Sequence, residues 1–182
     1  MQNIVLALSL LAASPAAPAV AHPATIAAPA VTPLTFFEGR SNSIGQMRVI
    51  FDAPRTVRAE SHGILAADGA LTLTQQIDEQ GKPPRTRIFR LRQMAPGRYA
   101  GTLSDASGPV TGEGSGNRLR LRYRMAGGLR VDQRLTLSPD RRAIRSRINV
   151  YRMGMLVGSV RETISRRETV PIGAAAVRSA AR

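Results

Sequence analysis

Few residues in this sequence have the types and spacing that catalysis needs. Glu60 and His62 stand two positions apart, so on a strand they would share one face and could act as an acid and base pair. The polar stretch around them is equally typical of an ordinary strand end. Asp78 and Glu79 precede a run of turn residues, which favours a solvated hairpin tip over the facing carboxylates of a glycosidase. Neither pair by itself predicts an enzyme.

Other chemical motifs are incomplete or missing. Residues 112–116, Gly-Glu-Gly-Ser-Gly, resemble a phosphate-binding loop, but such a loop must follow a strand and open a helix. Here the segment leads into a run of alternating arginines, so we interpret its glycines as turn residues. The chain has no cysteine and only His22 and His62, which cannot assemble the usual zinc ligands. The sequence therefore predicts no enzyme, no metal site and no cofactor.

Arginine is the strongest chemical feature of the chain. Lys and Arg number 26 against 12 Asp and Glu, which gives a net charge of +14. Every basic residue except Lys82 is arginine, whose planar guanidinium can hold a phosphate through two hydrogen bonds. The arginines of two successive alternating runs form a candidate anion-binding face, which Arg145 and Arg147 of a later run could extend: Arg118, Arg120, Arg122, Arg124, Arg130 and Arg134. Lipid phosphate or an anionic glycan would suit this face, and a merely solvated outer surface is the alternative. Nucleic acid is not an expected partner, because few aromatic residues accompany these arginines.

The elements that must position these residues are strands. From Arg118 to Met125 charged and apolar residues alternate without a break, which places the arginines on one face and the apolar residues on the other. Residues 129–137 alternate in the same way, and Ala-Gly-Gly at 126–128 predicts a hairpin turn between the two runs. The pattern recurs at Leu71 and Leu73, at Phe89 and Leu91, and in residues 144–150. Clusters of Gly, Pro, Asn and Asp separate these runs throughout.

Alternation of this kind predicts an all-β domain of about eight to ten short antiparallel strands in a small up-and-down barrel, with a sandwich as the alternative. A barrel of about eight strands is either filled by side chains or holds one small ligand. Six apolar residues are candidates for the interior or for a pocket lining: Phe89, Leu119, Leu121, Tyr123, Leu135 and Ile148. Glu162 falls on the apolar side of the last strand, where we expect an arginine partner first and a ligand-orienting charge second. A membrane-spanning barrel is not favoured, because the chain has no Trp, three Tyr and four Phe.

The two ends of the chain differ from its middle. An apolar stretch from Ile4 to Ala13 and the small residues at 19–21 predict a secretory signal peptide over residues 1–21, cleaved before His22. Residues 22–33 are rich in Ala and Pro and predict a linker, residues 34–167 the barrel domain, and residues 168–182 a flexible basic tail. We therefore expect an exported protein of the periplasm or cell envelope, not lipidated on cysteine.

Several short motifs resemble a known family. They are Phe36-Phe37-Glu38-Gly39-Arg40, Gly97-Arg98-Tyr99-Ala100-Gly101-Thr102 with Asp105 and Gly112, Gly114-Ser115-Gly116-Asn117 before Leu121-Arg122-Tyr123, and Gly154 with Val157-Gly158-Ser159-Val160. In order and spacing they are similar to the bacterial domain of unknown function 3833, over about Leu34 to Arg167. The resemblance implies a lipocalin-like barrel in an exported family whose members are commonly lipoproteins. This chain lacks the cysteine and the tryptophans that members usually keep.

Two hypotheses for function follow. In the first, the barrel holds a lipid or another small apolar molecule, with the cell envelope as its source. In the second, a packed structural barrel carries its arginine face to an anionic envelope surface. The oligomeric state is left open by the sequence.

Overall fold

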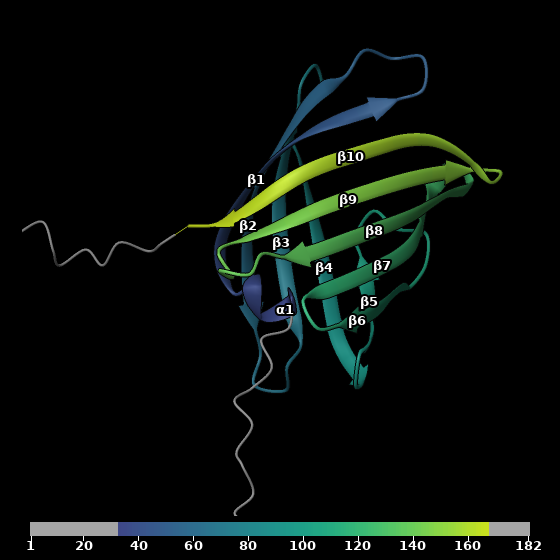
Figure 1. Cartoon of the computed structure of the whole chain (residues 1–182). Helices are drawn as coiled ribbons and strands as arrows, with labels where there is room; N and C mark the ends of the chain where they lie inside the picture. The colour runs from purple at the N-terminus through teal and green to yellow at the C-terminus, as the bar shows by residue number, and fades with distance from the viewer. Residues whose placement is uncertain (1–32, 168–182) are drawn as a thin grey trace, which may run out of the picture. The chain divides into compact units, whose positions relative to one another are not determined.

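Ten antiparallel strands close into a barrel in the computed structural model, which describes residues 33–167 (Figure 1). Each strand pairs with its neighbours in sequence, and the last pairs with the first. The predicted signal peptide, the basic tail and all but the last residue of the predicted linker lie outside the described residues. The strands are β1 (Gly39–Val49), β2 (Arg55–Leu65), β3 (Leu71–Glu79), β4 (Arg85–Ala95), β5 (Arg98–Leu103), β6 (Val110–Ser115), β7 (Arg118–Met125), β8 (Leu129–Leu137), β9 (Ala143–Arg152) and β10 (Met155–Arg166).

The prediction of an up-and-down, lipocalin-like barrel is confirmed. β7 and β8 coincide with the two alternating runs of the sequence, and the apolar residues of both strands face the interior. The turn between them is a short 3-10 segment, η1 (Ala126–Gly128), in which Gly127 and Gly128 take positive φ angles of 73° and 71°. Residues with a side chain rarely adopt this backbone conformation, so the two glycines explain why the chain reverses here.

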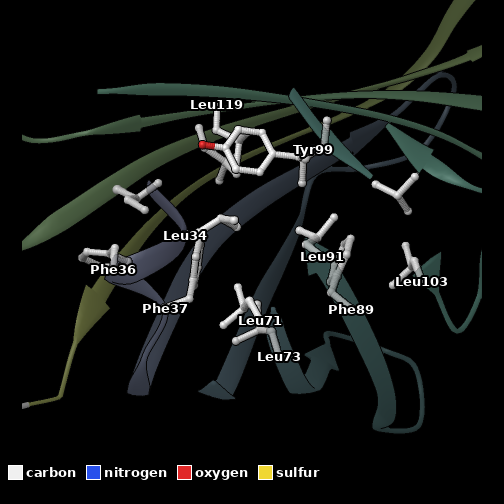
Figure 2. Close-up of a cluster of buried hydrophobic side chains, with 14 of the residues drawn as sticks. Leu34, Phe36, Phe37, Leu71, Leu73, Phe89, Leu91, Tyr99, Leu103 and Leu119 are labelled. Atoms are coloured by element: carbon white, nitrogen blue, oxygen red, sulfur yellow. The ribbon is translucent and has the colours of Figure 1, made fainter. Parts of the chain in front are cut away.

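One end of the barrel is closed by a single helical turn, α1 (Pro33–Phe36), which the strand pattern did not predict. Phe36 is 1% exposed and Phe37 5% exposed, and the ring centroids of the two lie 5.4 Å apart in an edge-to-face contact. Figure 2 shows these rings among leucines of the surrounding strands. Gly63 permits the approach, because a Cβ there would lie 1.8 Å from the carbonyl oxygen of Phe37.

The glycines of β6 serve packing rather than a turn. Gly112 and Gly114 lie within the strand, and a Cβ on either would come within 2.9 Å of Tyr99. The interpretation of these two residues as turn glycines was therefore wrong, because they make room for a buried tyrosine ring on the neighbouring strand. Gly116 does lie in the turn before β7, with a φ of 55°.

The opposite end of the barrel is less completely buried along β1, β2, β9 and β10, and we call it the open end. On β1 the inward residues Ser41 and Ser43 are buried near α1, whereas Met47, further along the strand, is half-buried. The inward residues of β2, β9 and β10 follow the same gradient, from buried near α1 to half-buried at the far end. We call the half-buried apolar part of this inner wall the mouth, and it consists of Met47, Val57, Val150 and Val160. No helix within residues 33–167 is long and apolar enough to cross a bilayer.

Replacing Phe36 should destabilise the whole barrel. Phe36→Ala removes a fully buried ring from the closed end, and we expect a loss of about 3–5 kcal/mol in the free energy of unfolding. Urea denaturation followed by circular dichroism measures the loss. Phe51→Ala is the matched control, because Phe51 is 99% exposed, and it should change the free energy by less than about 0.5 kcal/mol. Equal effects of the two substitutions would show that α1 does not close the core.

Candidate functional site

A layer of polar side chains crosses the interior between the closed end and the mouth. Gln75 of β3, Gln133 of β8 and Glu162 of β10 together line a small void of about 20 Å³. A void of this size holds about one water molecule. The inward polar residues of the layer are Ser43, Ser61, Gln75, Arg87, Gln133, Ser146 and Glu162. Buried polar groups require partners, so each contact in this layer bears on what the barrel can bind.

On one side of the layer three strands are joined by a chain of hydrogen bonds. Gln75 Nε2 donates to Ser61 Oγ at 3.0 Å, and Arg87 Nε donates to Gln75 Oε1 at 2.9 Å. The guanidinium of Arg87 also lies over the ring of Phe89, 5.3 Å from its centroid. No ion pair within residues 33–167 involves Arg87. A half-buried guanidinium is thus held inside the barrel without a carboxylate.

On the other side of the layer two acceptors are left incompletely used. Gln133 is 6% exposed and donates from Nε2 to Ser146 Oγ at 3.3 Å, while its Oε1 has no hydrogen-bond partner in the described chain. Ser43 donates to Glu162 Oε2 at 3.1 Å. The arginine partner expected for Glu162 is not found among residues 33–167, so the prediction of an ion pair was wrong there. The second interpretation, a charge that orients a ligand, stays a prediction.

The predicted interior residues lie inside the barrel. Phe89, Leu119, Leu121 and Leu135 line the small void, and Tyr123 and Ile148 are buried in the same core. Burial raises the pKa of the Tyr123 hydroxyl above its usual value, so this group stays a neutral phenol. Whether any of the six contacts a ligand stays a prediction.

The predicted arginine face lies on the outer wall of β7 and β8, where neighbouring acids occupy part of it. Arg120 Nε donates to Asp132 Oδ2 at 3.0 Å, and Arg134 Nε lies 3.5 Å from Asp132 Oδ1. Arg122 Nη1 lies 3.3 Å from Glu113 Oε1. Arg130 stacks on Tyr151, with 5.5 Å between its guanidinium carbon and the ring centroid. Several of the predicted anion-binding arginines therefore already have partners.

The strand register creates a different arginine cluster, which extends beyond the predicted face. Arg134, Arg147 and Arg161 stand directly opposite one another on β8, β9 and β10. Together with Arg145 they line an outer groove of about 470 Å³, whose other lining residues are Ile44, Thr136, Ser146, Thr163 and the acidic Glu162. No ion pair among residues 33–167 involves Arg145, Arg147 or Arg161. We call these four arginines the groove arginines. Arg161 was missed in the sequence, although its place between Val160 and Glu162 marks it as outward-facing.

Comparison with known families decides the identity of the domain. The family model described as "Protein of unknown function (DUF3833)" matches residues 10–166 of the chain. The chain belongs to the DUF3833 family. No curated protein matches it in sequence.

Solved structures support the fold of this DUF3833 domain. An S-type phycobiliprotein lyase from Guillardia theta has a TM-score of 0.58 at 8% identity, covering 75% of this chain and 91% of the lyase. Rv2717c from M. tuberculosis has a TM-score of 0.59 at 17% identity, covering 74% of this chain and 95% of Rv2717c. Identities this low show a shared lipocalin-like fold and nothing about activity.

The two candidate catalytic pairs of the DUF3833 domain are separated from the polar layer or tied up in ion pairs. Glu60 and His62 lie on the exposed outer face of β2. Glu79 is buried rather than solvated, because it faces inward near the open end and pairs with Lys82 Nζ at 2.9 Å and Arg55 Nε at 3.4 Å. The expectation of a solvated tip was wrong for Glu79, whose position at the end of β3 is inward by alternation.

The Asp132 ion pairs predict a pH dependence of stability. The hydrogen bond from Arg120 holds the pKa of the Asp132 carboxyl below its ordinary value. A lowered folded-state pKa adds stability that is complete above about pH 4 and is lost as the pH falls through the folded-state value. Asp132→Asn should therefore cost about 1 kcal/mol in urea denaturation at neutral pH, and the difference from the unmodified protein should shrink at pH 3 or below.

Asp78→Asn is the control for this measurement, because Asp78 is exposed and forms no ion pair with residues 33–167. It should have little effect at any pH. A difference between Asp132→Asn and the unmodified protein that grows as the pH falls would contradict the prediction.

Proposed function

We propose that this DUF3833 barrel binds a small amphipathic molecule through its open end. The observation that carries the proposal is the buried Gln133 carbonyl without a partner, lining the same void as Glu162. An unpaired buried acceptor lowers stability, so a ligand or water that donates to it would offset that cost. The mouth lies on the open side of this layer and offers apolar contact to the rest of such a molecule. The binding is proposed as non-catalytic.

The packing of the barrel limits what this ligand can be. Sites for drug-sized molecules usually enclose about 300–1,000 Å³, whereas the void at the polar layer has about 20 Å³. The closed half contains α1 and its surrounding leucines, and Leu34 of α1 and the adjoining Phe37 line this same void. A long acyl chain along the barrel axis would have to displace this core. A compact molecule, or one end of a lipid, fits better, with its body in the mouth and a single polar group reaching the layer.

The charges of the layer indicate the chemistry of that polar group. Glu162 and the Gln133 carbonyl accept hydrogen bonds, and Arg87 donates them. A group with both a donor and an acceptor, such as an amide or a hydroxyl, would satisfy both sides at once. The lipocalin-like fold supports the proposal, because a small barrel of this kind can hold one small ligand. Export to the periplasm or cell envelope, with envelope lipid as a source of ligand, belongs to the proposal and depends on residues 1–21.

A charge placed in the mouth should block binding. With N-phenyl-1-naphthylamine as an apolar fluorescent probe, Val160→Arg should raise the dissociation constant about tenfold or more, since burying the probe would then require desolvating a charge. Ile44→Arg is the control, because Ile44 is 56% exposed on the outer wall, and it should leave the dissociation constant unchanged. Fluorescence titration measures both.

Native mass spectrometry of the protein purified from its own cells complements this test. A bound small molecule that Val160→Arg removes and Ile44→Arg retains would support the site. Equal probe binding by all three proteins, with no molecule retained from cells, would overturn the proposal.

A second candidate function, anion binding on the outer wall, is favoured by the groove arginines. Like charges directly opposite on neighbouring strands destabilise a sheet, and Arg134, Arg147 and Arg161 stand in such a row. A polyanion in the groove would neutralise them and could receive bidentate hydrogen bonds. This site shares Arg134, which pairs with Asp132, with the predicted face, but its Arg145, Arg147 and Arg161 lie beyond the part of that face where acids pair with Arg120 and Arg122.

Removing charge from the groove should stabilise the free protein and abolish its response to anions. Arg147→Gln with Arg161→Gln should raise the melting temperature at low salt, and pyrophosphate should raise the melting temperature of the unmodified protein but not that of this variant. Arg90→Gln with Arg98→Gln removes the same charge from exposed positions outside the groove and should keep the response. Differential scanning fluorimetry measures both, and an unchanged pyrophosphate response in the groove variant would exclude the site.

A further inference from the structure

Large apolar side chains project from two hairpins at the open end. Phe51 is 99% exposed and Ile50 53% exposed on the β1–β2 hairpin, and Met153 is 91% exposed on the β9–β10 hairpin. Met155 and Leu156 extend the second hairpin and are also exposed. The backbone N–H of Ile50 donates to the carbonyl of Val157 at 3.0 Å, so the hairpins are neighbours. Both extend toward the right of the barrel in Figure 1.

The backbone at the two tips is unusual in the same way. Phe51 has a φ of 68° and Met153 a φ of 49°, in the left-handed region that favours glycine and asparagine. A bulky apolar residue there is both strained and exposed to water. Either cost would disappear with a small polar residue, so the fold does not explain these two side chains. Contact of these two side chains with an apolar phase outside the protein would explain them.

Basic side chains surround the two tips. Arg48 lies just before the first hairpin, and Arg152 stands opposite Met155 at the second. Arg124 and Arg130 face each other beside the neighbouring turn η1. No ion pair within residues 33–167 involves any of these four arginines, and Asp52, the acid of the first hairpin, is paired with Arg55 at 3.5 Å. We call these four residues the rim arginines. The open end therefore combines exposed apolar tips with positive charge that no ion pair neutralises.

We propose that the open end of the barrel docks on an anionic lipid bilayer. The tips Phe51 and Met153 enter the boundary between headgroups and acyl chains, and the rim arginines contact lipid phosphates. The charge of the chain argues against a second copy as the occupant, because self-association at this rim would bring two chains of +14 together. Docking in this orientation turns the mouth toward the membrane. It needs no ligand inside the barrel, so it holds independently of the proposed binding site.

Vesicle binding by tip variants tests this proposal. Phe51→Asn with Met153→Asn removes the apolar tips and suits the left-handed backbone. Flotation with phosphatidylglycerol-containing vesicles should show the unmodified chain bound, and the double variant should bind at least about tenfold more weakly. Binding should also weaken at high salt and on pure phosphatidylcholine vesicles. The double variant should unfold at the same urea concentration as the unmodified protein or a higher one.

The matched control removes two apolar side chains that are exposed elsewhere. Ile64→Asn with Met94→Asn changes residues that are 59% and 66% exposed outside both the tips and the arginine groove, and it should bind vesicles like the unmodified protein. An equal loss of vesicle binding in both double variants, or no loss of vesicle binding in the tip variant, would overturn the proposal. Dimerisation of the unmodified chain that the tip variant abolishes, without vesicle binding, would assign the tips to a protein interface instead. Probe binding in the mouth should not change in the tip variant, because Phe51 and Met153 do not belong to the mouth.

Discussion

The pairing of β1 with β10 is the constraint on which the rest of the structure depends. It closes the sheet, so every strand has two hydrogen-bonded neighbours and no edge is left open. Closure of ten strands also fixes an interior volume that the inward side chains must fill. Toward α1 the inward residues of β1 and β2 are small, and they are Ser41, Ser43, Ala59, Ser61 and Gly63. α1 packs against this thin wall and completes the core at one end only.

The local pattern of the sequence contains much of this fold, but not the contacts between distant segments. The strands follow from the alternation of apolar and polar residues, and the turns follow from the clusters with glycine. The ends of β7 and β8 coincide with the ends of the two alternating runs. The α1 turn could not be predicted, because its two phenylalanines are explained only by the space that closure leaves behind. The partner of Glu162 was predicted wrongly for the same reason. Ser43 lies 119 positions away in the chain, and only the β1–β10 register brings it near.

The positions of the arginines follow from the local sequence, whereas their ion pairs depend on contacts between distant strands. Alternation places the arginines of β7 on the outer wall, yet it does not tell which of them meet an acid. Asp132 meets Arg120 across one hairpin, whereas the row of Arg134, Arg147 and Arg161 depends on three strands being in register. Strand register is set by the alternating apolar pattern and by turn geometry, and not by the outward arginines that it aligns. A cationic face extending toward Arg145 and Arg147 could therefore be inferred from the sequence. The place of Arg161 opposite Arg147 and the pairing of Arg120 and Arg134 with Asp132 could not.

Departures from stable packing concentrate in the open half and on the outer wall rather than at the closed end. Gln133 keeps a buried acceptor unpaired, Phe51 and Met153 hold exposed apolar side chains on left-handed backbone, and the groove places like charges opposite one another. An apolar residue at position 133, small polar residues at the two tips and an acidic residue in the arginine row would relieve these costs without altering a strand. The closed end has apolar residues in close contact around α1, with the buried hydroxyl of Ser41 as its exception. A fold that packs one end so completely has the means to pack the other. The costs at the open half are therefore best explained by contacts with molecules outside the chain, which the polar layer, the tips and the groove would each make with a different chemistry.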